Sequence, residues 1–444
     1  MKAIRFNRVL LILASLAVAG FAAFGIRATL SRTQPLDEAR RTLSPISAES
    51  TLADKQMQKG QAMIKRAPSE PDGYNLLCAA YLQKARDTGD FTFNAKAETA
   101  LNHSFAVAAD NYDAIKLKAT LLLTYHRFGE ALEVARRARV LRPQDHTIYG
   151  ALTDALVELG RYDEARDAVE TMIRLKPDAS SYARLSYIYS LRGDTDGAIE
   201  VMRAAVKSST RQDAEGYAWY RTHLGDELMK AGELKEAERE FDIALEAFPN
   251  YHIALAAKAR ARVAANDLNS AVELYRQSQE RVPLPDIAIA LGDLYVKLGR
   301  TEEARKQYEL VEFIEQSSNA GAAPYSRQLA LFWANHDEKL DEALRIARSE
   351  RAARADIYTC DALAWCLYKT NDLNGAKAAI DEALRLGTRD ALLHYHAGMI
   401  YEKLGDQASA IKHLSRALKI NPSFDLLQAD VARQKLEELQ TRKR

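Results

Sequence analysis

The sequence predicts an all-α fold made of repeated helical hairpins. Composition is the first observation: Pro (11) and Gly (20) are scarce in the chain, whereas Ala and Leu are plentiful. Ala and Leu lose little conformational entropy in a helix, so this composition favours helices over strands. The second observation is an alanine that returns along the whole chain at nearly regular intervals. It occupies positions Ala97, Ala131, Ala165, Ala198, Ala237, Ala271, Ala304, Ala343, Ala376 and Ala410.

Small residues recur in register with these alanines, twelve positions before eight of them. They are Ala119, Thr153, Ser186, Gly225, Ala259, Gly292, Ala364 and Gly398. Small side chains let the two helices of a hairpin approach closely, and spacings of three and four keep the larger residues on one helical face. Larger residues three positions further on, such as Tyr189 and Leu228, fill the gap to the next hairpin.

Glycine and proline mark where the helices end. A glycine supplies a positive φ at low cost where the first helix must stop, at Gly160, Gly193, Gly232, Gly299 and Gly405. A proline ends the second helix because it lacks an N–H and clashes inside a helix. Five repeats close in this way, at Pro143, Pro177, Pro249, Pro283 and Pro422.

This pattern resembles the tetratricopeptide repeat, a helix-turn-helix unit of about 34 residues, in its bacterial-type members. The resemblance covers about residues 51–424 and implies a right-handed α-α superhelix, a solenoid of about ten repeats. We predict a lone helix over 51–66 that covers the first repeat and a capping helix over 425–444. The predicted repeats start near residues 71, 112, 146, 179, 218, 252, 285, 323, 357 and 391.

Three departures from the regular pattern stand out. The first repeat carries an insertion around residues 86–94, and the eighth has one extra residue in its turn, at Asn335-His336-Asp337. Residues 316–324 are irregular. We expect the superhelix to bend or break at this last segment.

The N-terminus predicts export. Lys2, Arg5 and Arg8 precede an uncharged stretch, Val9–Ile26, whose length is near the shortest that spans a bilayer. Residues 1–26 therefore form a transmembrane anchor or, because Ala17-Val18-Ala19 has the form of a cleavage site, a signal peptide. Residues 27–50 form a linker. The repeats then lie outside the cytoplasm, on a single-pass membrane protein or on a secreted or periplasmic one.

Charge and cysteine content exclude several function classes. The net charge is +1, so no large positive field attracts nucleic acid or anionic lipid. The three cysteines, Cys78, Cys360 and Cys366, form no C-x-x-C pair and so no zinc or redox motif. We expect each to be a small buried apolar residue.

No arrangement of residues predicts catalysis. None of the nine histidines belongs to an H-E-x-x-H motif, and His394 and His396 point to different faces of a helix. Asp194-Thr195-Asp196-Gly197 lacks the further ligands of a calcium loop and is expected to be a turn. We therefore predict that the protein is not an enzyme and binds no metal or cofactor.

The resemblance implies that the protein binds another protein or a peptide segment in the groove formed by the first helices. The main hypothesis is an exported or membrane-anchored scaffold that helps assemble an envelope or secretion complex. The alternative is a regulatory or substrate-presenting subunit of a separate enzyme. We expect no nucleic-acid partner, and membrane contact only through the N-terminal segment.

Groove positions 2, 5, 9 and 12 of each repeat give candidate binding residues. In repeats two and three these positions are mostly small or polar, as at Gly150 and Asp154. In repeats nine and ten they are aromatic or large, and aromatic residues and Met are enriched at binding hot spots. The candidates are Tyr358, Asp361, Trp365, Tyr368, Leu392, Tyr395 and Met399. The other interpretation is that these side chains pack against one another, or under the linker or terminal helix.

Overall fold

The computed structural model describes residues 51–318 and 326–442, which belong to one compact unit, Ser50–Arg444. These residues form 22 helices and no strand, which confirms the all-α prediction. None of these helices is both long and apolar enough to cross a bilayer. The predicted anchor or signal peptide (1–26) and linker (27–50) lie outside the described residues and stay predictions.

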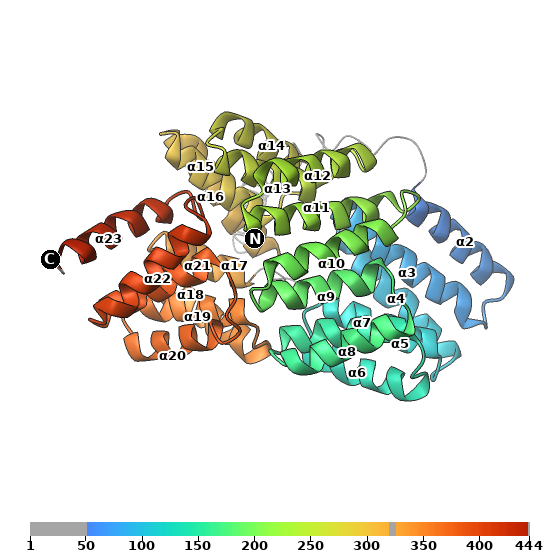
Figure 1. The fold of residues 1–444 in the computed structure, drawn as a ribbon. Coiled ribbons are helices and arrows are strands. Elements are labelled where there is room, and N and C mark those ends of the chain that lie inside the picture. The colour runs from blue at the N-terminus through green and yellow to red at the C-terminus, as the bar shows by residue number, and fades with distance from the viewer. Residues whose placement is uncertain (1–50, 319–325, 443–444) are drawn as a thin grey trace, which may run out of the picture. The chain divides into compact units, whose positions relative to one another are not determined.

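The helices follow one another as antiparallel hairpins (Figure 1). A lone helix comes first, α2 (Leu52–Arg66). Five hairpins follow: α3 (Pro71–Thr88) with α4 (Thr92–Val107), α5 (Tyr112–Thr124) with α6 (Phe128–Leu141), α7 (His146–Glu158) with α8 (Tyr162–Leu175), α9 (Ala179–Leu191) with α10 (Thr195–Ser208), and α11 (Ala214–Ala231) with α12 (Leu234–Ala247).

Five more hairpins complete the solenoid. They are α13 (His252–Ala264) with α14 (Leu268–Arg281), α15 (Pro285–Lys297) with α16 (Thr301–Ser318), α17 (Ser326–Asn335) with α18 (Leu340–Ala353), α19 (Ile357–Lys369) with α20 (Leu373–Ala383), and α21 (Ala391–Lys403) with α22 (Gln407–Ile420). The last helix, α23 (Gln428–Arg442), falls within the segment for which we predict a capping helix.

The ten predicted repeats are therefore present, and eight of their starts agree with the first helices within one residue. α11 begins four residues before the predicted start at 218 because the Asp213 side chain accepts a hydrogen bond from the backbone N–H of Gly216 and so caps an extra turn. The described part of α17 begins at Ser326, and the predicted start near 323 lies outside the described residues. The turn of the eighth repeat has the predicted extra residue, and Asp337 and Lys339 adopt positive φ there. The irregular segment at 316–324 lies largely outside the described residues.

The residues that define the repeat also define the core. All ten recurrent alanines are at most 2% exposed. A Cβ atom on Gly225 would meet the ring of Phe241 at 2.3 Å, so this glycine lets the two helices of the fifth repeat approach. The five glycines predicted to end first helices all have φ between 70° and 85°. Local packing thus follows the sequence pattern.

The three cysteines are buried, as predicted, and form no disulfide bond. Burial raises the pKa of the Cys78 and Cys366 thiols to about 12, and that of Cys360 to about 11. Because the thiolate is the reactive form, these side chains act as apolar packing residues.

Contacts between distant repeats were not expected from the sequence. One continuous core joins repeats two to four with repeats nine and ten, and it contains Leu156 and Tyr162 from repeat three and Ile357 and Ile380 from repeat nine. In Figure 1, α8 and α9 accordingly lie near α19 and α20. The solenoid is therefore stabilised by contacts within repeats, between neighbours, and between repeats six positions apart.

Candidate functional site

The structure places most of the predicted groove residues of repeats nine and ten inside the protein. Asp361 and Trp365 are 2% exposed, Tyr395 is 3% exposed and Met399 is 8% exposed. Tyr358, Tyr368 and Leu392 are partly buried and pack against the same core clusters. Four of the seven candidates therefore have little surface to offer a partner.

Neighbouring side chains account for this burial. The Trp365 ring stacks on Tyr368 at 4.8 Å and on His396 at 4.1 Å, and its Nε1 donates a hydrogen bond of 2.7 Å to Asn335. Phe424, which follows α22, packs on Tyr395 with ring centroids 5.3 Å apart. This arrangement favours the packing interpretation that the sequence left open. Partner binding by these seven residues stays a prediction.

The histidines of repeat ten make separate contacts. His394 Nδ1 lies 2.9 Å from His413 Nδ1, whereas His396 Nδ1 lies 2.9 Å from Asp361 Oδ1. His394 and His396 therefore face different neighbours, as expected. Within residues 51–318 and 326–442, no group of three or more His, Cys, Asp or Glu side chains could hold a metal ion.

A pocket of about 760 Å³ lies elsewhere, on the first helices of repeats one, three, four and five. Its lining comes from α3, α7, α9 and α11, with one residue from α10, and we call it the first-helix pocket. Three aromatic residues contribute to it: Tyr187, which is 41% exposed, and Trp219 and Tyr220, which are partly buried. Charged side chains from all four first helices complete the lining.

An ion pair between neighbouring repeats shapes one wall of the first-helix pocket. Arg184 donates two hydrogen bonds to Asp154, of 2.8 Å from Nε and 2.6 Å from Nη2. Gly150 makes room for it, because a Cβ atom there would come within 3.1 Å of the Arg184 guanidinium carbon. The small Gly150 and the acidic Asp154 of repeat three therefore allow Arg184 of repeat four to lie over the groove surface of repeat three.

The sequence held a signal for this pocket. Tyr187 occupies groove position nine of repeat four, and Trp219 occupies position two of repeat five. The predicted candidates all belong to repeats nine and ten, so they do not include these two aromatic residues. Gathering them with α3 of repeat one depends on the curvature of the solenoid, which the local pattern does not reveal.

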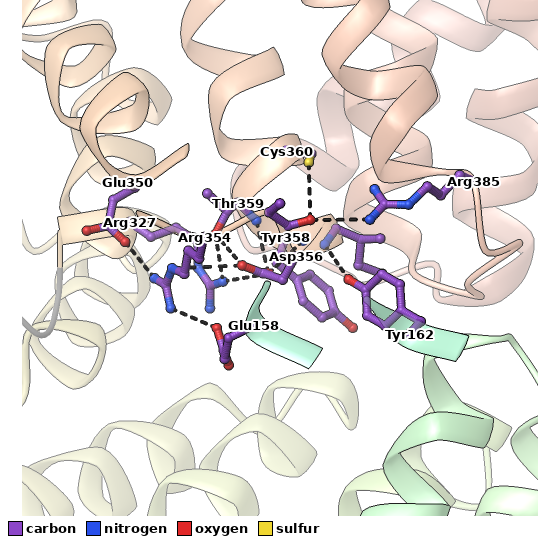
Figure 2. Close-up of polar contacts among 12 residues, drawn as sticks. Glu158, Tyr162, Arg327, Glu350, Arg354, Asp356, Tyr358, Thr359, Cys360 and Arg385 are labelled. Carbon is purple, nitrogen blue, oxygen red and sulfur yellow. Dashed lines mark hydrogen bonds and ion pairs between the residues drawn. The ribbon is translucent and has the colours of Figure 1, made fainter. Parts of the chain in front are cut away.

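The contact between repeats three and nine lies beside the pocket, and we call it the junction. Figure 2 shows Arg354 between Glu350 and Glu158, with nitrogen–oxygen distances of 2.7 and 3.2 Å. Arg354 is 6% exposed, and Glu158 also lines the first-helix pocket. Burial raises the pKa of Glu158, since it outweighs the favourable effect of Arg354 and Arg327.

Backbone groups take part in the junction too. The Ala355 N–H donates to the Glu158 carbonyl oxygen at 2.9 Å, and the Ile357 N–H donates to the Tyr162 hydroxyl at 2.8 Å (Figure 2). Arg327 reaches Asp356 at 3.0 Å, and Asp356 caps α19. The end of α7 is thereby fixed against the start of α19, which orders the pocket wall that Glu158 belongs to.

One predicted candidate, Tyr358, comes close to the first-helix pocket. Burial raises its pKa well above the usual range, and Tyr187 and Glu227 of the pocket add to this effect. The guanidinium of Arg327 lies 5.9 Å from the Tyr358 ring centroid. Tyr358 is thus the sequence-predicted residue that the structure brings toward the pocket.

Family models match several regions of the solenoid. Models described as tetratricopeptide repeat match residues 122–186, 179–210, 223–284, 256–320 and 391–424. The chain contains tetratricopeptide repeats. The hairpins outside these matches contain the same buried recurrent alanine, although α17 and α20 are shorter, at 10 and 11 residues.

Individual proteins are similar to parts of this tetratricopeptide-repeat chain. A curated relative, BBSome complex member BBS4 of Bos taurus, is 26% identical over an alignment of 155 residues that covers 30% of this chain. The match also spans only 30% of that relative's length. The solved structure of PilW, a type IV pilus biogenesis factor, is 18% identical with a TM-score of 0.39, covering 47% of this chain and 93% of PilW. A monomeric mutant of IFIT1 solved with Gppp-AAAA is 15% identical with a TM-score of 0.48, covering 74% and 76% of the two chains.

Tetratricopeptide-repeat proteins are scaffolds for protein interactions, and their repeats bind proteins or peptides. The fold is typically non-catalytic. The first-helix pocket lies on the first helices and combines aromatic rings with charged groups.

Proposed function

We propose that this protein is a scaffold that binds a segment of another protein in the first-helix pocket. The pocket itself carries the proposal. Its volume of about 760 Å³ admits several side chains, and Tyr187 exposes 41% of its surface there without a hydrogen-bonding partner for its hydroxyl among the described residues. Tyrosine supplies a large contact area at low entropic cost and is enriched at binding hot spots.

We further propose that the scaffold works outside the cytoplasm, in the assembly of an envelope or secretion complex. This part rests on the sequence of residues 1–26, in which positive charges precede an uncharged stretch. A reporter that is active only outside the cytoplasm, fused to the C-terminus, should be active. Activity of a cytoplasm-only reporter would contradict the export.

Site-specific cross-linking tests the pocket. A photo-reactive amino acid at Tyr187 should cross-link the full chain to a defined partner in native membranes, and mass spectrometry should identify one segment of that partner. The control position is Val140 on α6, which is 79% exposed and lies outside the pocket. The same cross-links from both positions, or none from Tyr187, would exclude the pocket as the binding site.

The identity of the cross-linked partner separates the two roles. Structural or transport proteins of the envelope would support the scaffold. A single enzyme cross-linked in equal amount would support the alternative, a regulatory or substrate-presenting subunit.

A further inference from the structure

Charge is unevenly matched along the first-helix pocket. On the side formed by α7, α9 and the end of α11, carboxylates are paired with cations from the protein. Arg184 lies 2.6 Å from Asp154, and Lys230 lies 2.7 Å from Glu227. This side of the pocket is close to neutral and leaves little net charge for a ligand.

The other end, between α3 and the start of α11, is different. Asp87 and Glu215 are 7% and 9% exposed, and the Gln83 amide bridges them, donating at 2.7 Å to Asp87 and 3.3 Å to Glu215. Asp213 adds a third, exposed carboxylate. Arg86 is the cation of the pocket lining at this end, and its hydrogen bonds go to neutral oxygens.

The positive charge near the carboxylates at this end does not balance their negative charge. Burial raises the pKa of both Asp87 and Glu215, and the attraction of Arg86 does not cancel this effect. Lys84, which also acts on Asp87, is held 2.7 Å from Asp54 of α2. An added cation would therefore be stabilised here more than at the paired end.

The aromatic rings nearby point to the same kind of ligand. Tyr217, one turn into α11, has Arg211 and Arg221 within 5.4 and 5.0 Å of its ring centroid. Trp219 and Tyr220, which line the pocket, pack edge to face with ring centroids 5.2 Å apart, and His223 lies 3.7 Å from the Trp219 centroid. Neither ring has a lysine or arginine over it among residues 51–318 and 326–442. Aromatic faces attract ammonium and guanidinium groups, most strongly where carboxylates lie close by.

We infer that the α3–α11 end of the first-helix pocket takes a lysine or arginine side chain of the bound protein segment. The cation would lie between the carboxylates of Asp213 and Glu215 and the rings of Trp219 and Tyr220. This inference rests on the proposed function, because it assigns the chemistry of a segment that the pocket is proposed to bind. It also assigns direction: the cationic residue lies toward α3, and the rest of the segment runs toward Tyr187.

Selection of random dodecapeptides on the full chain tests the inference. Bound peptides should be enriched in Lys or Arg at one position, and the double variant D213N/E215Q should bind them about tenfold more weakly, as expected for the loss of charge-assisted hydrogen bonds. Asn caps helices as well as Asp, and Gln keeps an acceptor for the 3.0 Å hydrogen bond from the Tyr251 hydroxyl, so the variant should fold. The matched control is D163N/E302Q, whose side chains are 95% and 73% exposed outside the pocket.

The outcomes distinguish the inference from the proposed function. Peptides that cross-link at Tyr187 without enrichment in Lys or Arg would overturn the inference and leave the proposed function intact. Equal binding of enriched peptides to the wild type and to D213N/E215Q would also overturn it. Failure of any peptide to cross-link at Tyr187 would count against both. Free spermidine at equal concentration should not displace the peptides. Displacement by spermidine would show that the site recognises an ammonium group alone rather than a protein segment, and would contradict the inference.

Discussion

The hydroxyl of Tyr162 accepts a hydrogen bond of 2.8 Å from the backbone N–H of Ile357, which lies 195 residues later in the chain. Both residues are buried, at 5% and 0% exposed. The bond links the start of α8 to the start of α19. It thus makes two repeats that are far apart in sequence part of one cooperative unit, unlike a solenoid in which each repeat contacts only its neighbours.

The change of Tyr162 to Phe tests this link. It should lower the free energy of unfolding by about 1–3 kcal/mol, because the Ile357 N–H is left buried without an acceptor. Chemical denaturation measures the loss, and hydrogen exchange should show faster exchange at the start of α19. The control is Tyr295→Phe, since the Tyr295 ring is 5% exposed but its hydroxyl has no hydrogen bond among the described residues. Equal stability of the two variants would mean that the hydrogen bond between Tyr162 and Ile357 adds nothing to the free energy of unfolding.

Overpacking tests the repeat register. Ala237 and Ala410 are both 0% exposed, so substitution of either by Leu should destabilise the protein by about 1–3 kcal/mol. Thermal melting of each single variant gives the effect. Ala95→Leu, at an exposed position of α4, is the control and should melt like the wild type. Unchanged melting of both core variants would show that these alanines do not set the packing distance.

The pKa of Glu215 predicts a dependence of stability on pH. Burial raises this pKa above the value of 4.5 expected in the unfolded chain; Asp87 adds to the rise, whereas Arg86 and the hydrogen bonds from Tyr251 and Gln83 oppose it. The folded state then binds more protons than the unfolded state between the two pKa values, so stability falls as pH rises through this window.

Glu215→Gln removes that dependence. The variant should be more stable than the wild type at neutral pH, and the difference should vanish below about pH 4.5, where Glu215 is protonated in both states. Urea unfolding at several pH values measures the difference. A variant that is less stable than the wild type at neutral pH would show that the Glu215 carboxylate is already compensated.

Alanine substitution separates the two interpretations of the C-terminal aromatic residues. Because Trp365 and Tyr395 are 2% and 3% exposed, the double change to Ala should lower the unfolding free energy by several kcal/mol, with about 3–5 kcal/mol typical of a buried aromatic residue. Phe424→Ala should cost less, since Phe424 is only partly buried. Melting and partner capture are measured together. A double variant that keeps its melting temperature but loses its partner would support a binding role for these residues.

The sequence by itself determined the repeat, its register and its local packing. Ala237, Gly225 and Phe241 lie close together in the chain, and the size of each side chain fixes how closely the two helices of the fifth repeat pack. Such local rules repeat in every hairpin, so the spacing places eight of the ten hairpin starts within one residue. The glycines that end the first helices can be predicted from the sequence as well, because the preference for a positive φ is a property of a single residue.

Only the tertiary structure decided which repeats meet. The small rotation between successive hairpins is set by many weak contacts and accumulates along the chain, so a sequence pattern that fixes each hairpin does not fix where the tenth will lie. Three features depend on this accumulated rotation. They are the hydrogen bond between Tyr162 and Ile357, the burial of Trp365, and the meeting of Glu215, Trp219 and Tyr187 in one pocket. For this reason the sequence predicted the binding fold, whereas the structure located the pocket on repeats one, three, four and five.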